Sequence, residues 1–122
     1  MVRPHLFAWQ RADYHRFHQS PLNRALHLVG VPLFVLGLLE VPCALATAHV
    51  GLAALGPLGI VVGFGLQGLG HKRLEAVPSI PFDGTVDALT RILAEQFVTF
   101  WRFALSGFAP ARGGAAEGGG RG

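Results

Sequence analysis

The sequence predicts an all-α protein, a small integral membrane helical bundle with a two-span antiparallel hairpin. Charged residues make up 14% of the chain, whereas about 25% is usual in soluble domains. Between Leu28 and Leu66 the only ionisable side chains are those of Glu40, Cys43 and His49. Such a stretch is too apolar to form the surface of a small soluble protein. It is long enough to cross a bilayer twice, as helices of about 20 residues each.

The first predicted element is a short amphipathic helix from His5 to Gln19 at the membrane interface. Ser20 and Pro21 then start the next helix, because serine is a favoured N-cap and proline costs nothing at the first helical position. That helix extends to about Ala48. These residues therefore predict an interfacial helix followed by the first span.

The second span is predicted from about Val50 to Gly70. Its glycines at positions 56, 59 and 63 leave a shallow face, and small residues at such spacings allow membrane helices to approach closely. We therefore expect the two spans to pack against each other through these glycines.

A third helix is predicted over Val86–Phe108, with apolar residues at a helical period on one side and polar residues such as Asp87 and Glu95 opposite. A helix with two such faces is expected to lie at the interface or to pack across the hairpin, and a third span is the alternative. We assign residues 1–110 to a single membrane-embedded helical domain. Residues 111–122 are predicted to form a disordered glycine-rich tail.

The charge distribution indicates the orientation of the chain. The formal charge is +3, but the basic residues form no stripe of the kind that binds nucleic acid, so no nucleic-acid partner is expected. Basic residues instead flank the apolar segments, at Arg3, Arg11, Arg16, Arg24, Lys72 and Arg73. By the positive-inside rule the N-terminus and the histidines near it are cytoplasmic. The membrane is expected to be the bacterial cytoplasmic membrane or, in a eukaryote, the endoplasmic reticulum.

The hairpin brings histidines to one membrane depth. His27 lies 22 residues before residue 49, near the predicted turn, and His71 lies 22 residues after it. Antiparallel helices of equal length place these two residues at the same height, at the inner interface. Asn23 is four residues before His27 and Glu75 is four residues after His71, so each pair shares a face if the helix is continuous.

The inner end of the hairpin therefore collects up to four imidazoles, one carboxylate and one amide. The single cysteine lies within an apolar segment, so neither a disulfide nor a paired-cysteine metal site is expected. Imidazoles with one carboxylate suit Fe(II), Zn(II), Mn(II) or Cu(II), and with open positions they are typical of non-haem Fe(II) oxygen chemistry. The same histidines could instead be hydrogen-bonded across the helix pair. The candidate metal ligands are His15, His18, His27, His71 and Glu75.

Two segments of the chain resemble a known family. "YHRFHQSPLNRALHLVGVP" and "LQGLGHKRLEAVPSIP" are similar to two blocks of the small membrane proteins that include the fungal 2-hydroxy-palmitic acid dioxygenase. The paired spacing of the blocks is specific, and together they span most of residues 14–78. The matching positions are Tyr14, His18, Asn23, His27, Gly30, Pro32, Gln67, Gly70, His71, Glu75 and Pro78.

The resemblance implies an Fe(II)-dependent dioxygenase that uses O₂ to act on long-chain 2-hydroxy fatty acids in a membrane. It assigns metal binding to His18, His27 and His71, with Glu75 as their matched partner. Glu75 would be a fourth ligand or an acceptor that orients His71.

Tyr14, Asn23 and Glu75 are the candidates for catalytic roles. Asn23 would hold the substrate carboxylate or a metal ligand, and Tyr14 would hydrogen-bond a bound oxygen species. A 2-hydroxy acid offers a carboxylate oxygen and an adjacent hydroxyl, which together can chelate a metal. Cleavage of its C1–C2 bond would give carbon dioxide, water and a fatty acid one carbon shorter.

Two other classes of function stay open. The chain could be a haem- or metal-binding membrane subunit without lipid turnover, with two of its histidines as axial haem ligands. It could also be a structural membrane hairpin that packs against a partner. Membrane lipid is an expected partner of this chain, and the sequence does not decide whether it forms a homo-oligomer.

Overall fold

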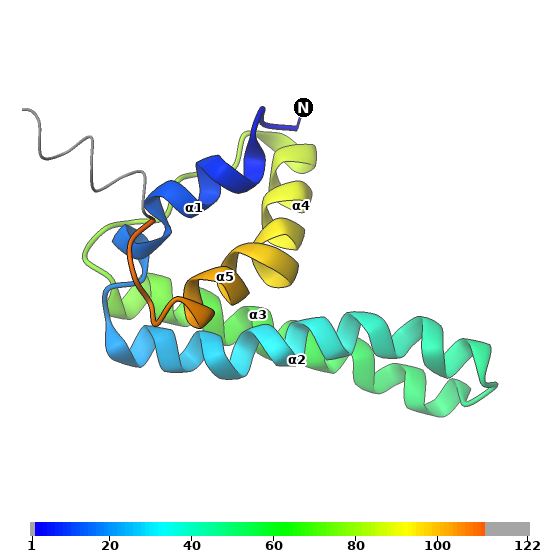
Figure 1. Ribbon diagram of the computed structural model, residues 1–122. Helices are drawn as coiled ribbons and strands as arrows, with labels where there is room; N and C mark the ends of the chain where they lie inside the picture. The colour runs from blue at the N-terminus through cyan, green and yellow to red at the C-terminus, as the bar shows by residue number, and fades with distance from the viewer. Residues whose placement is uncertain (1, 112–122) are drawn as a thin grey trace, which may run out of the picture. The chain divides into compact units, whose positions relative to one another are not determined.

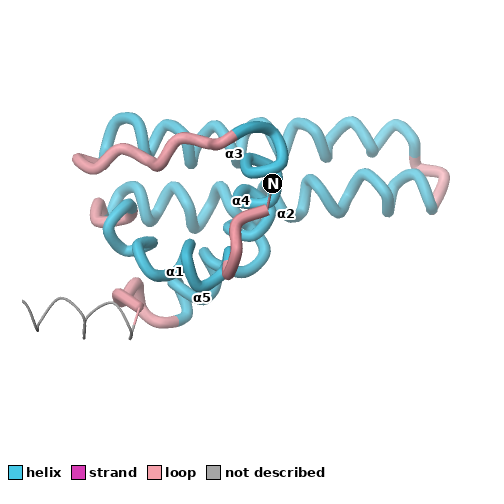
Figure 2. The backbone as a smooth tube through the Cα atoms, turned by 90° about the horizontal axis from the view of Figure 1, so that it is seen from above, coloured by secondary structure: helices cyan, strands magenta, loops and turns pink. Residues whose placement is uncertain are grey.

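The structure is a computed structural model that describes residues 2–111 of the chain. Figure 2 shows these residues as helices joined by loops, and no strand occurs within the described range. The all-α prediction is therefore confirmed. The helices form two compact units, one of residues 20–75 and one that combines the residues before 20 with those after 75. The single domain over residues 1–110 stays a prediction, and the predicted tail lies outside the described residues except for residue 111.

The unit of residues 20–75 contains two long helices and a short connection. Its elements are α2 (Pro21–Ala46), the 3-10 helix η1 (Val50–Ala54) and α3 (Leu55–Leu74). Ser20 is the N-cap of α2, as predicted, and its hydroxyl accepts a hydrogen bond of 3.3 Å from the Asn23 N–H. Helix α3 continues beyond Gly70, the predicted end of the second span.

Helices α2 and α3 lie side by side with opposite directions, and glycines allow their backbones to touch (Figure 1). A methyl group built on Gly30 would lie 2.7 Å from the carbonyl oxygen of Gly63. One built on Gly37 would lie 2.5 Å from that of Gly56. Gly59 also faces the backbone of α2. The glycine face predicted from the sequence is therefore the contact surface, and any larger residue there would force the helices apart.

Both long helices have the length and composition of membrane spans. Within the described residues, Pro21–Ala46 and Val50–Leu74 are the two helical stretches long and apolar enough to cross a membrane. Large apolar side chains stay exposed along them, for example Leu36 at 65% and Val61 at 68%. Exposure to water costs roughly 25 cal/mol for each Å² of apolar surface, whereas acyl chains would cover these side chains at no such cost.

The other unit contains α1 and a longer helical stretch made of three successive segments. The elements are α1 (Leu6–Phe17), α4 (Gly84–Ala94), the π-helical segment η2 (Glu95–Thr99) and α5 (Phe100–Leu105). The sequence predicts this stretch over Val86–Phe108, so its type is confirmed and both ends lie earlier than predicted. Gly107 and Phe108 have φ values of 72° and 62°, a left-handed conformation that ends the helix.

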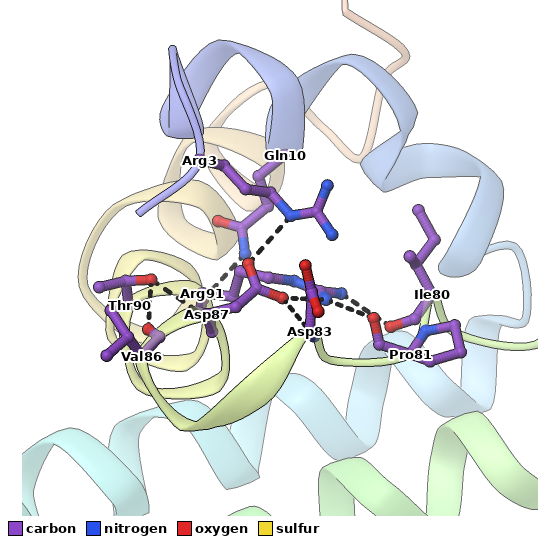
Figure 3. A network of polar contacts seen from close by, with 9 residues as sticks. All are labelled: Arg3, Gln10, Ile80, Pro81, Asp83, Val86, Asp87, Thr90 and Arg91. Atoms are coloured by element: carbon purple, nitrogen blue, oxygen red, sulfur yellow. Dashed lines mark hydrogen bonds and ion pairs between the residues drawn. The ribbon is translucent and has the colours of Figure 1, made fainter. Parts of the chain in front are cut away.

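A buried polar network holds the start of α4 to the loop before it and to the N-terminal residues (Figure 3). Asp87 is 1% exposed and accepts hydrogen bonds from Arg3 Nε at 3.0 Å and from the Asp83 N–H at 2.9 Å. Arg91 donates to the same carboxylate at 3.1 Å and to two carbonyl oxygens of the loop. These donors, the Asp83 N–H foremost, lower the pKa of Asp87 to about 2. The network is therefore charged at neutral pH.

Candidate metal centre

His18 directly follows α1 and is almost completely buried, with 2% of its surface exposed. Its Nδ1 lies 2.8 Å from the backbone carbonyl oxygen of Tyr14, one turn earlier. A carbonyl oxygen can only accept, so this contact requires the proton on Nδ1. Neutral His18 then carries its lone pair on Nε2, the atom through which it can bind a metal.

Glu95 lies beside this nitrogen, at the point where α4 passes into η2. The Tyr14 hydroxyl donates a hydrogen bond of 2.7 Å to Glu95 Oε1, and His18 Nε2 lies 3.8 Å from the same oxygen. The rings of Tyr14 and His18 are stacked, with centroids 3.8 Å apart. π-helical turns are frequent at functional sites, and this one brings a carboxylate to a histidine.

Burial governs the electrostatics of these side chains. It raises the pKa of Tyr14 well above the ordinary value of 10.0, and the neighbouring Glu95 acts in the same direction. Burial also raises the pKa of Glu95, because the charged carboxylate loses hydration. The Tyr14 hydroxyl therefore remains a hydrogen-bond donor at neutral pH, and a cation beside Glu95 would stabilise its charged form.

His27 and His71 form a second pair, within the unit of α2 and α3. Their ring centroids lie 4.9 Å apart with perpendicular planes, and His27 is fully buried. Their equal distance from residue 49 in the sequence predicts this meeting. His27 Nδ1 lies 2.9 Å from the backbone carbonyl oxygen of Asn23. This histidine, like His18, therefore carries its lone pair on Nε2 when neutral.

Asn23 and Glu75 connect the start of α2 with the end of α3. Glu75 Oε1 accepts hydrogen bonds from the Ser20 N–H at 2.7 Å and from Asn23 Nδ2 at 3.1 Å. Asn23 Oδ1 is buried without a hydrogen-bond partner among the described residues, and a side chain at Gly70 would overlap it. The two predicted candidates thus lie together. Glu75 is in an extended conformation after α3, so it shares no helical face with the histidine before it.

Each unit therefore holds one pair of potential metal ligands. The ligand atoms of His18 and Glu95 lie within 4.8 Å of each other, and so do those of His27 and His71. Imidazole nitrogens with a carboxylate oxygen suit Fe(II), Zn(II) or Mn(II), so the donor chemistry fits the predicted metal. The remaining histidine candidate, His15, belongs to neither pair, and its ring lies edge-on to a phenylalanine at 6.3 Å.

Sequence reasoning did not identify Glu95 as a site residue. Its hydrogen bond with Tyr14 joins positions that are 81 residues apart, and no helical periodicity predicts such a contact. The available signal was a glutamate on the polar side of a helix that is otherwise rich in apolar residues.

Comparison with known proteins agrees with the resemblance found in the sequence. The family model described as 2-hydroxy-palmitic acid dioxygenase Mpo1-like matches residues 5–108, which include both ligand pairs. No curated protein and no solved structure matches the chain. Because the family match covers most of the sequence, the chain belongs to the 2-hydroxy-palmitic acid dioxygenase Mpo1-like family.

Proposed function

We propose that the protein is an Fe(II)-dependent dioxygenase that converts long-chain 2-hydroxy fatty acids into fatty acids one carbon shorter. The description of its family supports a reaction of this kind. One observation carries the proposal: His18 and His27 each place Nδ1 against the carbonyl oxygen four residues earlier. Metal-binding histidines are usually oriented by such a hydrogen bond, which directs the other ring nitrogen to the metal.

Both ligand pairs serve one metal ion in this proposal. His18 is two residues before Ser20, and two residues span at most about 7 Å, so the chain itself keeps His18 near the start of α2. We do not assign Glu75 as a metal ligand, because its Oε1 already accepts hydrogen bonds from the Ser20 N–H and from Asn23 Nδ2. Its predicted role as an acceptor that orients His71 stays a prediction. The ligands that we assign to the iron are His18, His27, His71 and Glu95.

Tyr14 and Asn23 act through the ligands. The Tyr14 hydroxyl donates a hydrogen bond to the carboxylate of Glu95. The backbone carbonyl oxygen of Asn23 accepts one from the Nδ1–H of His27. Both contacts fix the direction of a ligand atom before the metal binds. The roles predicted from the sequence, contact of Tyr14 with an oxygen species and of Asn23 with the substrate carboxylate, stay predictions.

The bound iron would supply the activation of O₂ for cleavage of the C1–C2 bond. A 2-hydroxy acid presents a carboxylate oxygen and a neighbouring hydroxyl, which form a five-membered chelate with a metal that has open positions. One substrate molecule and one O₂ give the shorter acid, carbon dioxide and water. This equation balances without an external reductant.

We further propose that α2 and Val50–Leu74 cross a membrane, with the histidines at its cytoplasmic side. Arg24 lies near the start of the first span and Lys72 and Arg73 near the end of the second, whereas no lysine or arginine occurs between them. This distribution follows the positive-inside rule. The acyl chain of the substrate would lie in the same membrane.

Haem binding between His27 and His71 is less compatible with the geometry. Their rings are in edge contact at 4.9 Å, so a porphyrin between them would have to separate α2 from α3. These helices touch through the backbones of Gly30 and Gly63. A preparation with the absorption of haem would nevertheless favour that alternative.

The proposal is tested with protein purified in detergent without added metal and then loaded with Fe(II). We expect conversion of 2-hydroxypalmitate to the C15 acid, with one CO₂ formed for each O₂ consumed. His27→Ala should abolish turnover. His49→Ala is the matched control, because this exposed histidine contacts Thr47 at the opposite end of α2. Undiminished turnover after exhaustive chelation would contradict the metal role.

A further inference from the structure

The helical stretch of α4, η2 and α5 exposes its apolar side chains. The exposed fractions of six large apolar residues lie between 36% and 86%. They follow one another at intervals of three or four residues, which places them on one side of a helix. This surface, called the apolar ridge below, consists of Val86, Leu89, Leu93, Phe97, Trp101 and Leu105.

Four polar side chains of the same helical stretch are buried, those of Asp87, Arg91, Gln96 and Thr99. Asp87, Gln96 and Thr99 are each 1% exposed. Arg91 is 9% exposed and bonds to Asp87, while Gln10 of α1 receives a hydrogen bond from Thr99 and donates one of 2.9 Å to the Arg91 carbonyl oxygen. Asp87, Arg91 and Thr99 thus make these hydrogen bonds with residues of the same unit. A helix at a water-facing surface buries its apolar residues and exposes its polar ones, so this stretch has the opposite arrangement.

We propose that the apolar ridge lies in the acyl chains of the bilayer surface, with the helix in the plane of the interface. The inference rests on the membrane insertion that belongs to the proposed function. Residues 75–83 connect α3 with α4, and nine residues span at most about 30 Å. The connection therefore limits the start of α4 to about 30 Å from the end of α3, which would lie at the bilayer surface.

An in-plane position suits the charged groups better than a third span. Between Asp87 and Arg102 the stretch also contains Arg91 and Glu95, and charged groups at the centre of a bilayer are costly. The Trp101 Nε1–H donates to a backbone carbonyl oxygen at 2.8 Å, so the exposed part of its ring is apolar. Arg102 beside it is exposed and can meet anionic headgroups, an arrangement typical of interfacial helices.

Tryptophan fluorescence tests this position, because the chain contains two tryptophans. In Trp9→Phe the remaining reporter is Trp101 on the ridge. In Trp101→Phe it is Trp9, which lies 4.3 Å from the Arg3 guanidinium and 5.1 Å from that of Arg91. In phosphatidylcholine vesicles with brominated acyl chains, we expect quenching of Trp101 to exceed that of Trp9 several-fold. Equal quenching would overturn the inference.

Depth separates an in-plane helix from a span. The variant with Trp9→Phe, Trp101→Phe and Leu89→Trp moves the reporter 12 positions along the ridge, which is about 18 Å of helix. Lipids brominated at different acyl carbons should report the same depth for positions 89 and 101. Depths that differ by most of that length would overturn the in-plane placement.

A reporter on α2 separates failure of this inference from failure of the proposed function. Leu36→Trp in a background without Trp9 and Trp101 places the reporter on a residue that is 65% exposed. Quenching at position 36 without quenching at Trp101 overturns the inference and leaves the membrane insertion intact. Absence of quenching at both positions contradicts insertion and, with it, the inference.

A disulfide cross-link tests whether a second copy of the chain covers the ridge instead. If Leu93→Cys in a Cys43→Ser background forms a disulfide dimer and Trp101 is unquenched, the ridge contacts a second copy, and the lipid assignment is overturned.

Discussion

Tyr14→Phe removes a single hydroxyl from the candidate metal centre. The ring of residue 14 can keep its stack on His18, with centroids 3.8 Å apart, and its edge contact with Phe103 at 5.0 Å. What disappears is the hydrogen bond of 2.7 Å to Glu95 Oε1. The variant therefore measures how far this hydroxyl prepares Glu95 to bind a metal.

The lost hydrogen bond determines the expected decrease in metal affinity. A hydrogen bond to a charged group contributes about 1.5–3 kcal/mol, and about 1.4 kcal/mol corresponds to a tenfold change in affinity. Part of this free energy already stabilises the metal-free protein, so the value is an upper limit for the loss of metal-binding free energy. Loss of a group that orients a metal ligand usually weakens binding by about 10- to 100-fold, and we expect Tyr14→Phe to fall in that range.

The assay is an anaerobic titration with Fe(II), or with Co(II) followed by its visible absorption. Thr90→Val is the matched control, because it removes a hydroxyl that bonds to Val86 within α4, outside the ligand pairs. The control should bind metal and unfold like the wild type, whereas Tyr14→Phe should unfold at a lower temperature, because its metal-free form also loses the hydrogen bond to the buried Glu95. Unchanged metal affinity in Tyr14→Phe would refute the orienting role of this hydroxyl.

Three further predictions test the fold and the division of roles between carboxylates. Gly63→Ala puts a methyl group against the backbone of α2 and should lower the unfolding temperature in detergent, whereas Gly65→Ala, whose methyl group meets open space, should not. Because the folded-state pKa of Asp87 is lowered from 3.8 to about 2, its contribution to stability is present above pH 3.8 and is lost as the pH falls through about 2. Acid unfolding monitored by circular dichroism should therefore show a smaller loss of stability over this window in Asp87→Asn than in the wild type. Glu75→Gln should lower the unfolding temperature and retain iron in elemental analysis, whereas Glu95→Gln should lose iron.

Local patterns in the sequence predict the pair of His27 and His71. Helical rise is uniform, so equal counts from residue 49 bring the two residues together, and their ring centroids lie 4.9 Å apart. The glycines of α3 are likewise recognisable, because close backbone contact requires residues without side chains. Both features follow from helical periodicity and from the lengths of the apolar segments, which can be read from a single sequence.

Two features depend on tertiary contacts and could not be predicted in this way. Glu95 meets Tyr14 across 81 positions, and neither residue type nor spacing indicates that partner. The polar side of the third helix suggests exposure, yet Asp87 and Arg91 are buried in a network with Arg3. An amphipathic pattern shows that a helix has two faces, but the surrounding chain decides which of them faces inward.

The iron content of three forms of the protein tests the central claim most directly, namely that histidines of both units hold one metal ion. Wild type, His18→Ala and His71→Ala are loaded with Fe(II) anaerobically, freed of excess metal and analysed for iron per chain. A single shared ion predicts one iron per chain in the wild type and almost none in either variant. Two ions per chain in the wild type, or full retention of iron by either variant, would contradict it.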